Sequence, residues 1–158
     1  MIRFKYPLVI FLVSNIILIM DIVTIDTNVV ISALKSKNGA SYKLMMLLLK
    51  DLFIPNISVP LFIEYKSVAK REGVVDNLTQ KEVDAILDYY LSKSKIHKIF
   101  YLWRPFLKDP KDDLVLEVAV KSESRYIITF NKKDFMGCDK FGITAVTPHE
   151  YMTKRGLL

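Results

Sequence analysis

The sequence predicts an α/β domain in which helices cover both faces of a parallel sheet. Short runs rich in β-branched residues alternate along the chain with longer segments of helical character. This alternation is typical of parallel sheets, because parallel strands need a crossover connection that is usually a helix. The connections are short, as in one compact domain. With 158 residues, 51% of them hydrophobic and 25% charged, the chain can bury a core of this kind.

Five segments are predicted to be strands. The first, residues 22–25, is a β-branched run that suits a strand buried on both faces. The second, residues 52–59, contains Pro55, which removes a ladder hydrogen bond and favours an edge or irregular strand. The remaining predicted strands span residues 96–102, 126–130 and 144–146.

Six segments are predicted to be helical, and most carry a recognisable start signal. Ser41 is a candidate N-cap, and Pro60 suits the first turn of a helix. Thr79 and Glu82 have the spacing of a capping box, and Asp109 precedes a proline at the next helix start. The predicted helices span residues 28–34, 41–50, 60–71, 79–92 and 109–123, and a last one begins at residues 147–150.

The composition excludes several classes of site. Cys138 is the single cysteine, so neither an intramolecular disulfide framework nor a cysteine-rich zinc site is available. His97 is expected in a short strand and His149 in a helix, without a metal-binding spacing between them, which disfavours zinc hydrolase chemistry. The formal net charge of +6 suits an anionic polymer, although a lysine surplus that only keeps the protein soluble explains it equally well.

Residues 1–19 differ from the rest and are predicted to be an apolar extension of a domain that spans residues 20–158. Arg3 and Lys5 precede an apolar run that resembles parts of a signal peptide but lacks a small-residue cleavage pattern. The run is also shorter than the roughly 20 residues that span a bilayer. Three interpretations stay open: a misassigned start, a segment that associates with a membrane, and secretion.

Acidic residues stand where an α/β sheet brings side chains together. Asp26 ends the first predicted strand, Glu64 lies one turn into the 60–71 helix, and Asp112 and Asp113 open the 109–123 helix. Ligand sites in open α/β sheets form outside the carboxyl ends of the strands. Carboxylates that converge there repel one another unless a cation neutralises them, and Mg²⁺ or Mn²⁺ suits oxygen ligands. The pattern therefore predicts metal-assisted phosphodiester chemistry.

Each acid also has a purely structural interpretation. The Asp26 carboxylate can cap the helix that follows, and Glu64 can lie on a solvated stripe. Asp109 is the expected N-cap of its helix, which leaves Asp113 as the preferred ligand and Asp112 as the alternative.

Polar residues around Asp26 and after the 126–130 strand are expected to support the site. Thr27 and Asn28 are candidates for orienting its ligands. One group of the later loop is expected to complete a metal site, directly or through water, and its lysines to meet a phosphate backbone unless they are simply solvated. The candidates in this loop are Thr129, Asn131, Lys132 and Asp134.

Four motifs in order resemble those of PIN domains, over about residues 21 to 153. They are Ile25–Val30, Pro60–Tyr65, Asp109–Asp113 and Ile128–Phe135. The resemblance is to small prokaryotic PIN proteins described as toxin components of toxin–antitoxin pairs. It implies a Rossmann-like three-layer α/β/α fold with a central parallel sheet, and a cytoplasmic ribonuclease that depends on Mg²⁺ or Mn²⁺.

The resemblance also assigns site residues. Asp26, Glu64 and Asp113 match the three central acids of the family and are expected to hold the metal that activates water. Asn131 occupies a fourth position that is often Asp, so an oxygen ligand is kept while one negative charge is lost.

The resemblance implies RNA as substrate and a separate antitoxin protein as partner, and the apolar helices are compatible with a homodimer. Two other function classes stay open. One is a PIN-like module that binds RNA or protein without catalysis. The other is a phosphatase with an aspartyl nucleophile, which Asn28 disfavours because a second acid is expected there.

Overall fold

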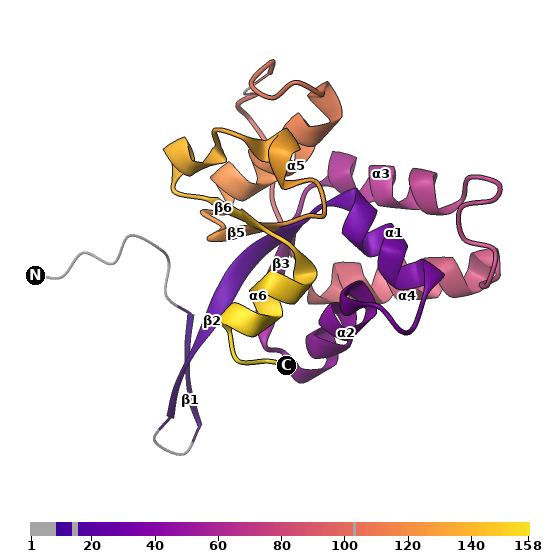
Figure 1. The fold of residues 1–158 in the computed structure, drawn as a ribbon, viewed down its shortest axis with the longest axis horizontal. Coiled ribbons are helices and arrows are strands. Elements are labelled where there is room, and N and C mark those ends of the chain that lie inside the picture. Colours follow the sequence, from indigo (N-terminus) through magenta and orange to yellow (C-terminus); the bar gives the residue numbers. More distant parts are fainter. Residues whose placement is uncertain (1–8, 14–15, 103) are drawn as a thin grey trace, which may run out of the picture.

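The computed structural model describes residues 9–13, 16–102 and 104–158. Its centre is a sheet with the strand order β4-β3-β2-β5-β6 (Figure 1). Every pair along this path is parallel, and β1 pairs with the first half of β2 in the antiparallel direction. The strands are β1 (Val9–Val13), β2 (Ile16–Ile25), β3 (Phe53–Ile57), β4 (Lys95–Ile96), β5 (Tyr126–Ile128) and β6 (Thr144–Val146).

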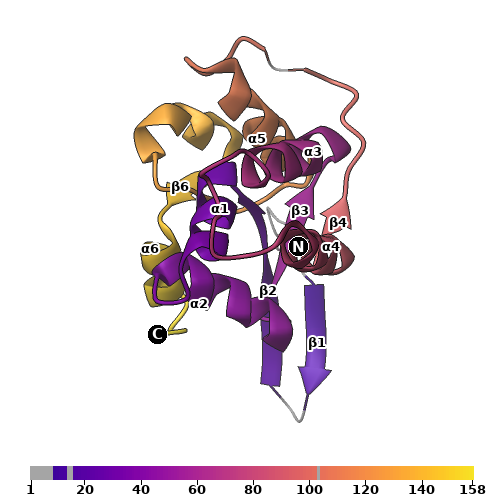
Figure 2. The same cartoon turned by 90° about the vertical axis from the view of Figure 1, so that its right-hand side faces the viewer.

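The helices follow the predicted order and complete a three-layer α/β/α arrangement. Figure 2 shows α6 and α4 on opposite sides of the sheet. The helices are α1 (Thr27–Lys35), α2 (Ala40–Leu47), α3 (Val59–Ala69), α4 (Gln80–Lys93), α5 (Pro110–Lys121) and α6 (Pro148–Lys154). Short 3₁₀ turns cover Leu48–Lys50, Lys132–Phe135 and Cys138–Phe141. The predicted fold class is therefore confirmed.

Most predicted helix starts are confirmed by cap hydrogen bonds. Thr79 forms the expected capping box with Glu82, and the Asp109 side chain accepts from the Lys111 amide at 2.9 Å. The prediction of Ser41 as an N-cap is wrong. Helix α2 begins at Ala40 with Gly39 as its N-cap, so Ser41 lies inside the first turn and is buried there.

Two strand predictions are corrected by how the strands pair. β3 lies inside the sheet rather than at its edge, but β4 pairs only with Asn56 and Ile57, so Pro55 stands beyond the reach of β4. The predicted strand 96–102 is reduced to Lys95–Ile96, because β3 ends at Ile57 and offers no further backbone partner. His97 follows β4, donates its amide to the Ile57 carbonyl at 2.8 Å, and places Nε2 2.6 Å from the Asn56 side-chain oxygen.

Strand β2 also begins earlier than predicted, at Ile16 instead of Ile22, and forms a hairpin with β1. Figure 1 shows this hairpin extending away from the helices. Residues 1–8, 14 and 15 lie outside the described residues, and the division at residue 20 stays a prediction. Within the part of the chain that the structure describes, no helix is long and apolar enough to cross a membrane.

A buried ion pair holds the last helix against β2. Asp21 is 4% exposed, and Arg155 Nε lies 2.7 Å from its carboxylate. The Tyr151 hydroxyl donates to the same carboxylate at 3.2 Å. On the other side of the core, the Tyr65 hydroxyl of α3 donates to the carbonyl of Ile25. These bonds fix the end of β2, which is the strand that carries the candidate site.

Candidate active site

The candidate site lies where the strand order of the sheet reverses. From β2 the chain moves to β3 and β4 on one side, and it later returns to β5 and β6 on the other side. The Asp26 amide donates to the Ile128 carbonyl at 2.9 Å, so the ends of β2 and β5 are joined at this point. Crevices at such switch points are the usual ligand sites of open α/β sheets.

Asp26 directs its carboxylate into this crevice. It is the N-cap residue of α1, but its side chain caps none of the amides of that helix, which the structure describes in full. Instead the Thr129 hydroxyl donates to Oδ2 of Asp26 at 2.6 Å. Burial raises the pKa of Asp26 against the opposing hydrogen bond from Thr129, and the negative charge of Glu64 raises it further. The carboxylate is thus available to a ligand.

Thr129 and Asn28 organise the loop that faces Asp26. The Thr129 hydroxyl accepts from the Asn131 amide at 3.0 Å, which directs its proton toward Asp26. Asn28 Nδ2 donates to the same hydroxyl at 3.5 Å, and Oδ1 of Asn28 accepts from the Phe130 amide at 3.5 Å. Both residues therefore take the supporting position that was predicted for them, while Asn131 enters the network through its backbone.

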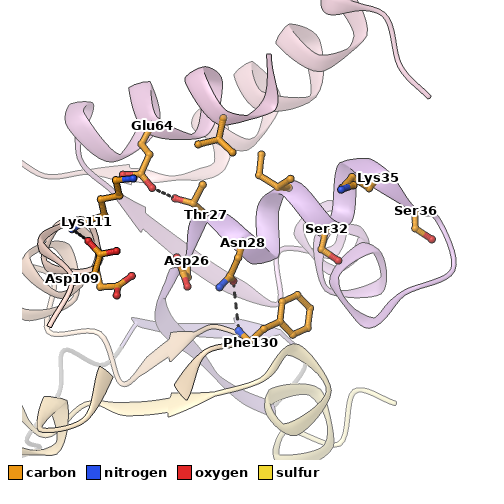
Figure 3. Close-up of a pocket in the computed structure, with 13 residues that line it drawn as sticks. Asp26, Thr27, Asn28, Ser32, Lys35, Ser36, Glu64, Asp109, Lys111 and Phe130 are labelled. Atoms are coloured by element: carbon orange, nitrogen blue, oxygen red, sulfur yellow. Dashed lines mark hydrogen bonds between the residues drawn. The ribbon is translucent and has the colours of Figure 1, made fainter. Parts of the chain in front are cut away.

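Glu64 reaches the site from α3. Ser58 caps this helix through the Leu61 amide, and Leu61 and Tyr65 are both fully buried, which sets the rotation of the helix. Glu64 is therefore turned toward α1, where the Thr27 hydroxyl donates to Oε1 at 2.5 Å (Figure 3). The solvated alternative does not describe this side chain.

Asp112 and Asp113 point in different directions, and the preference for Asp113 as a ligand does not match the geometry. Asp113 is fully buried and accepts from the amides of Leu107 at 3.0 Å and Phe106 at 3.4 Å. Asp112 is half-buried and lines the cleft. Successive residues of a helix point about 100° apart, so only one of two neighbours can face the site.

The electrostatics of Asp112 show that the acids lie close together. Burial raises the pKa of Asp112 to about 6, and the negative charges of Asp26, Asp109, Asp134 and Glu64 contribute to this rise in that order. Asp134 thus acts on the site by its charge, from the 3₁₀ turn Lys132–Phe135. A divalent cation would relieve this repulsion.

The cleft has a volume of about 690 Å³ and is acidic at one end and basic at the other (Figure 3). Within the described residues, no three His, Cys, Asp or Glu side chains converge closely enough to hold a metal ion by themselves. Mg²⁺ usually keeps several waters and binds through one or two carboxylates plus substrate phosphates, so the donor set fits such an ion. The carboxylates that line the cleft are Asp26, Glu64, Asp109 and Asp112.

A family model described as PIN domain matches residues 22–133. The chain belongs to the PIN domain family. PIN domains are generally nucleases that use divalent metal ions, and the matched stretch contains Asp26, Glu64 and Asp112. No curated protein matches the chain.

A solved structure shares the fold of this PIN domain. It is a chain of the crystal structure of VapBC2 from Rickettsia felis bound to a DNA fragment from their promoter. The sequence identity is 18% and the TM-score is 0.54. The match covers 80% of this chain and 98% of the other.

The cleft of this PIN domain contains residues that were not predicted from the sequence. Asn28 is followed on α1 by Ser32 and Lys35, four and seven residues later, a spacing that places them on one helix face. That polar periodicity was the available signal. Lys111 and Phe130 also line the cleft, whereas Lys132, a predicted substrate contact, forms an ion pair with Glu150 at 2.6 Å.

Arg104 is expected to stabilise the loop in front of the site through a two-pronged ion pair. Its Nε and Nη2 atoms each lie 3.0 Å from a carboxylate oxygen of Glu117, which is 2% exposed. Removing one partner of a buried pair leaves an uncompensated charge, so Arg104→Met should lower the free energy of unfolding by about 2–3 kcal/mol.

Urea unfolding of the single variant and of Arg104→Met with Glu117→Met measures this effect. The double variant should recover much of the loss, because no unpaired charge remains. Equal stability of wild type and the single variant would contradict the proposed role of the ion pair.

Proposed function

We propose that this PIN domain is an Mg²⁺- or Mn²⁺-dependent endoribonuclease that hydrolyses RNA phosphodiester bonds. The observation that carries the proposal is the cleft at the switch point, where the charges of Asp26 and Glu64 help to raise the pKa of Asp112 to about 6. A site with this excess of negative charge suits a divalent cation and, through it, a phosphate group.

Asp26, Glu64 and Asp112 are the residues that would hold the ion. When bound, a divalent ion supplies a water of lowered pKa and offsets the charge that develops on the phosphate. The protein contributes orientation: Thr129 holds the Asp26 carboxylate at 2.6 Å, and Thr27 holds that of Glu64 at 2.5 Å. Asn131 and Asp134 are proposed to act from the loop behind Asp26, without a direct place among the main ligands.

We further propose that the protein is the toxin component of a toxin–antitoxin pair, acting in the cytoplasm. Support comes from the four sequence motifs and from the fold shared with a chain of the VapBC2 complex. The proposed partners are an antitoxin protein and, through the apolar helix surfaces, a second copy of the chain. An antitoxin that places an arginine among the carboxylates would block the site by a charge-assisted contact.

Cleavage of a mixed panel of RNAs by the purified full chain tests the enzymatic function. We expect cleavage with Mg²⁺ or Mn²⁺ and none in EDTA, because the acidic site repels phosphate until a cation is present. Single-stranded DNA of matched sequence serves as the comparison substrate. Cleavage that persists in EDTA contradicts the metal-dependent site, and RNA binding without any turnover favours the non-catalytic module.

A further inference from the structure

The cleft continues from its acidic end along one face of α1. Asn28, Ser32 and Lys35 line it at successive turns, and Ser36 follows at the end of the helix (Figure 3). At a rise of 1.5 Å per residue, Lys35 lies about 10 Å along the helix from Asn28. The Ser36 hydroxyl accepts from the Asn38 amide at 3.3 Å, which leaves its proton available to donate. This end of the cleft can therefore hold an anion.

Phe130 forms the wall opposite this helix face. It follows the buried Thr129, yet its ring is 46% exposed and lines the cleft. The bond from its amide to Asn28 Oδ1, 3.5 Å long, ties its backbone to the helix that carries Lys35. Figure 3 shows the ring facing the polar side of α1 near Ser32. A flat apolar surface is thus held next to a cationic one.

We propose that Phe130, Ser32, Lys35 and Ser36 form a subsite for a nucleotide that flanks the scissile bond. In this α1 subsite the base stacks on the Phe130 ring, and Lys35 with the two serine hydroxyls binds the adjacent phosphate. Aromatic platforms beside positive charge are the recurring means of holding single-stranded nucleic acid. The substrate class is therefore RNA whose bases are unpaired at the cleavage site. This inference rests on the proposed nuclease function.

Neither the helix dipole of α1 nor a protein ligand accounts for this cleft as fully as a nucleotide does. Lys35 lies in the last turn of α1, where it complements the dipole, but this does not explain the exposed ring opposite it. A protein segment could occupy the cleft through Phe130, Ile31 and Val68, yet the cleft joins the acidic centre to a polar helix face. That arrangement suits a strand that alternates phosphates and bases, and binding of single-stranded RNA separates the two occupants.

Fluorescence anisotropy with a labelled single-stranded RNA in EDTA tests the subsite without cleavage. Stacking on an aromatic ring is worth about 1–3 kcal/mol per base, so Phe130→Ala should weaken binding roughly 5- to 100-fold. Phe130→Tyr keeps the ring and should bind like wild type. Lys35→Ala should weaken binding and reduce the slope of log Kd against log salt by about 0.7, the value for one phosphate contact with a single strand.

Lys43→Ala provides the matched control, because Lys43 is an exposed lysine of the neighbouring helix α2 that lies outside the cleft lining. Its binding and salt slope should stay those of wild type to within the loss of general charge. A series of RNAs with one abasic position each locates the stacked base. At that position wild type should bind weakly, and Phe130→Ala should lose no further affinity.

The outcomes distinguish the subsite from the nuclease function. Cleavage with unchanged binding in Phe130→Ala and Lys35→Ala overturns the subsite and leaves the nuclease standing. RNA binding that follows the expected pattern, without cleavage in Mg²⁺ or Mn²⁺, supports the subsite and contradicts the nuclease. Failure of wild type to bind single-stranded RNA overturns the subsite and favours a protein occupant.

Discussion

Asp26→Asn is expected to abolish metal-dependent RNA cleavage while the domain stays folded. The amide keeps an oxygen that can accept from Thr129, but it removes the charge that the sheet holds at the centre of the cleft. Loss of one preorganised electrostatic group commonly costs on the order of 10²–10³ in rate, and loss of a metal ligand should cost at least that much. The rate is measured with Mn²⁺ at saturating concentration.

Two controls make the loss of activity interpretable. Thermal unfolding in EDTA should show that Asp26→Asn is at least as stable as wild type, because burial raises the pKa of Asp26 and the neutral amide avoids that penalty. Asp76→Asn removes an exposed acid outside the cleft lining and should retain full activity. Wild-type rates in Asp26→Asn would refute the assignment of the site.

Asp112→Asn and Asp113→Asn are expected to fail for different reasons. Asp112 faces the cleft, so Asp112→Asn should lose metal affinity and cleavage. Asp113 instead holds the amides of Phe106 and Leu107. An amide there presents a donor to one of these donors, so Asp113→Asn should lower the free energy of unfolding by about 1–3 kcal/mol. At temperatures where it is folded, its metal affinity should resemble that of wild type.

The pH dependence of stability without metal identifies Asp112 independently. Its pKa is raised from 3.8 to about 6 in the folded protein, so the folded state binds more protons than the unfolded state between these values. Stability therefore falls as pH rises through this window, and the full penalty is present above it. Asp112→Asn removes the penalty and should raise the free energy of unfolding by about 1 kcal/mol at neutral pH, after allowance for solvent screening of this half-buried group.

Urea unfolding in EDTA at several pH values and calorimetric titration with Mn²⁺ measure both variants. The gain in Asp112→Asn should disappear below about pH 4, where the carboxyl is neutral in both states. If Asp113→Asn lost metal affinity while Asp112→Asn kept it, Asp113 would be restored as the ligand that the family resemblance implied.

Local sequence was sufficient for those features of the fold that depend on neighbours in the chain. Thr79 with Glu82 and Asp109 with its proline predicted helix starts that the structure confirms, because caps are bonds between residues two or three apart. The run 22–25 predicted a buried strand for the same reason. The predicted strand 96–102 was wrong in extent, since a strand also needs a partner, and β3 ends too soon to provide one.

The sequence by itself determined the α/β class, the order of elements and the acidic residues that can reach the carboxyl edge of the sheet. Only the tertiary structure decided that Asp112 rather than Asp113 faces the cleft, and that Lys132 pairs with Glu150. It also placed Phe130 against Lys35, which are 95 residues apart in the chain. The physical reason is that the rotation of a helix is set by which face packs against the sheet, and contacts between distant segments exist only after that packing.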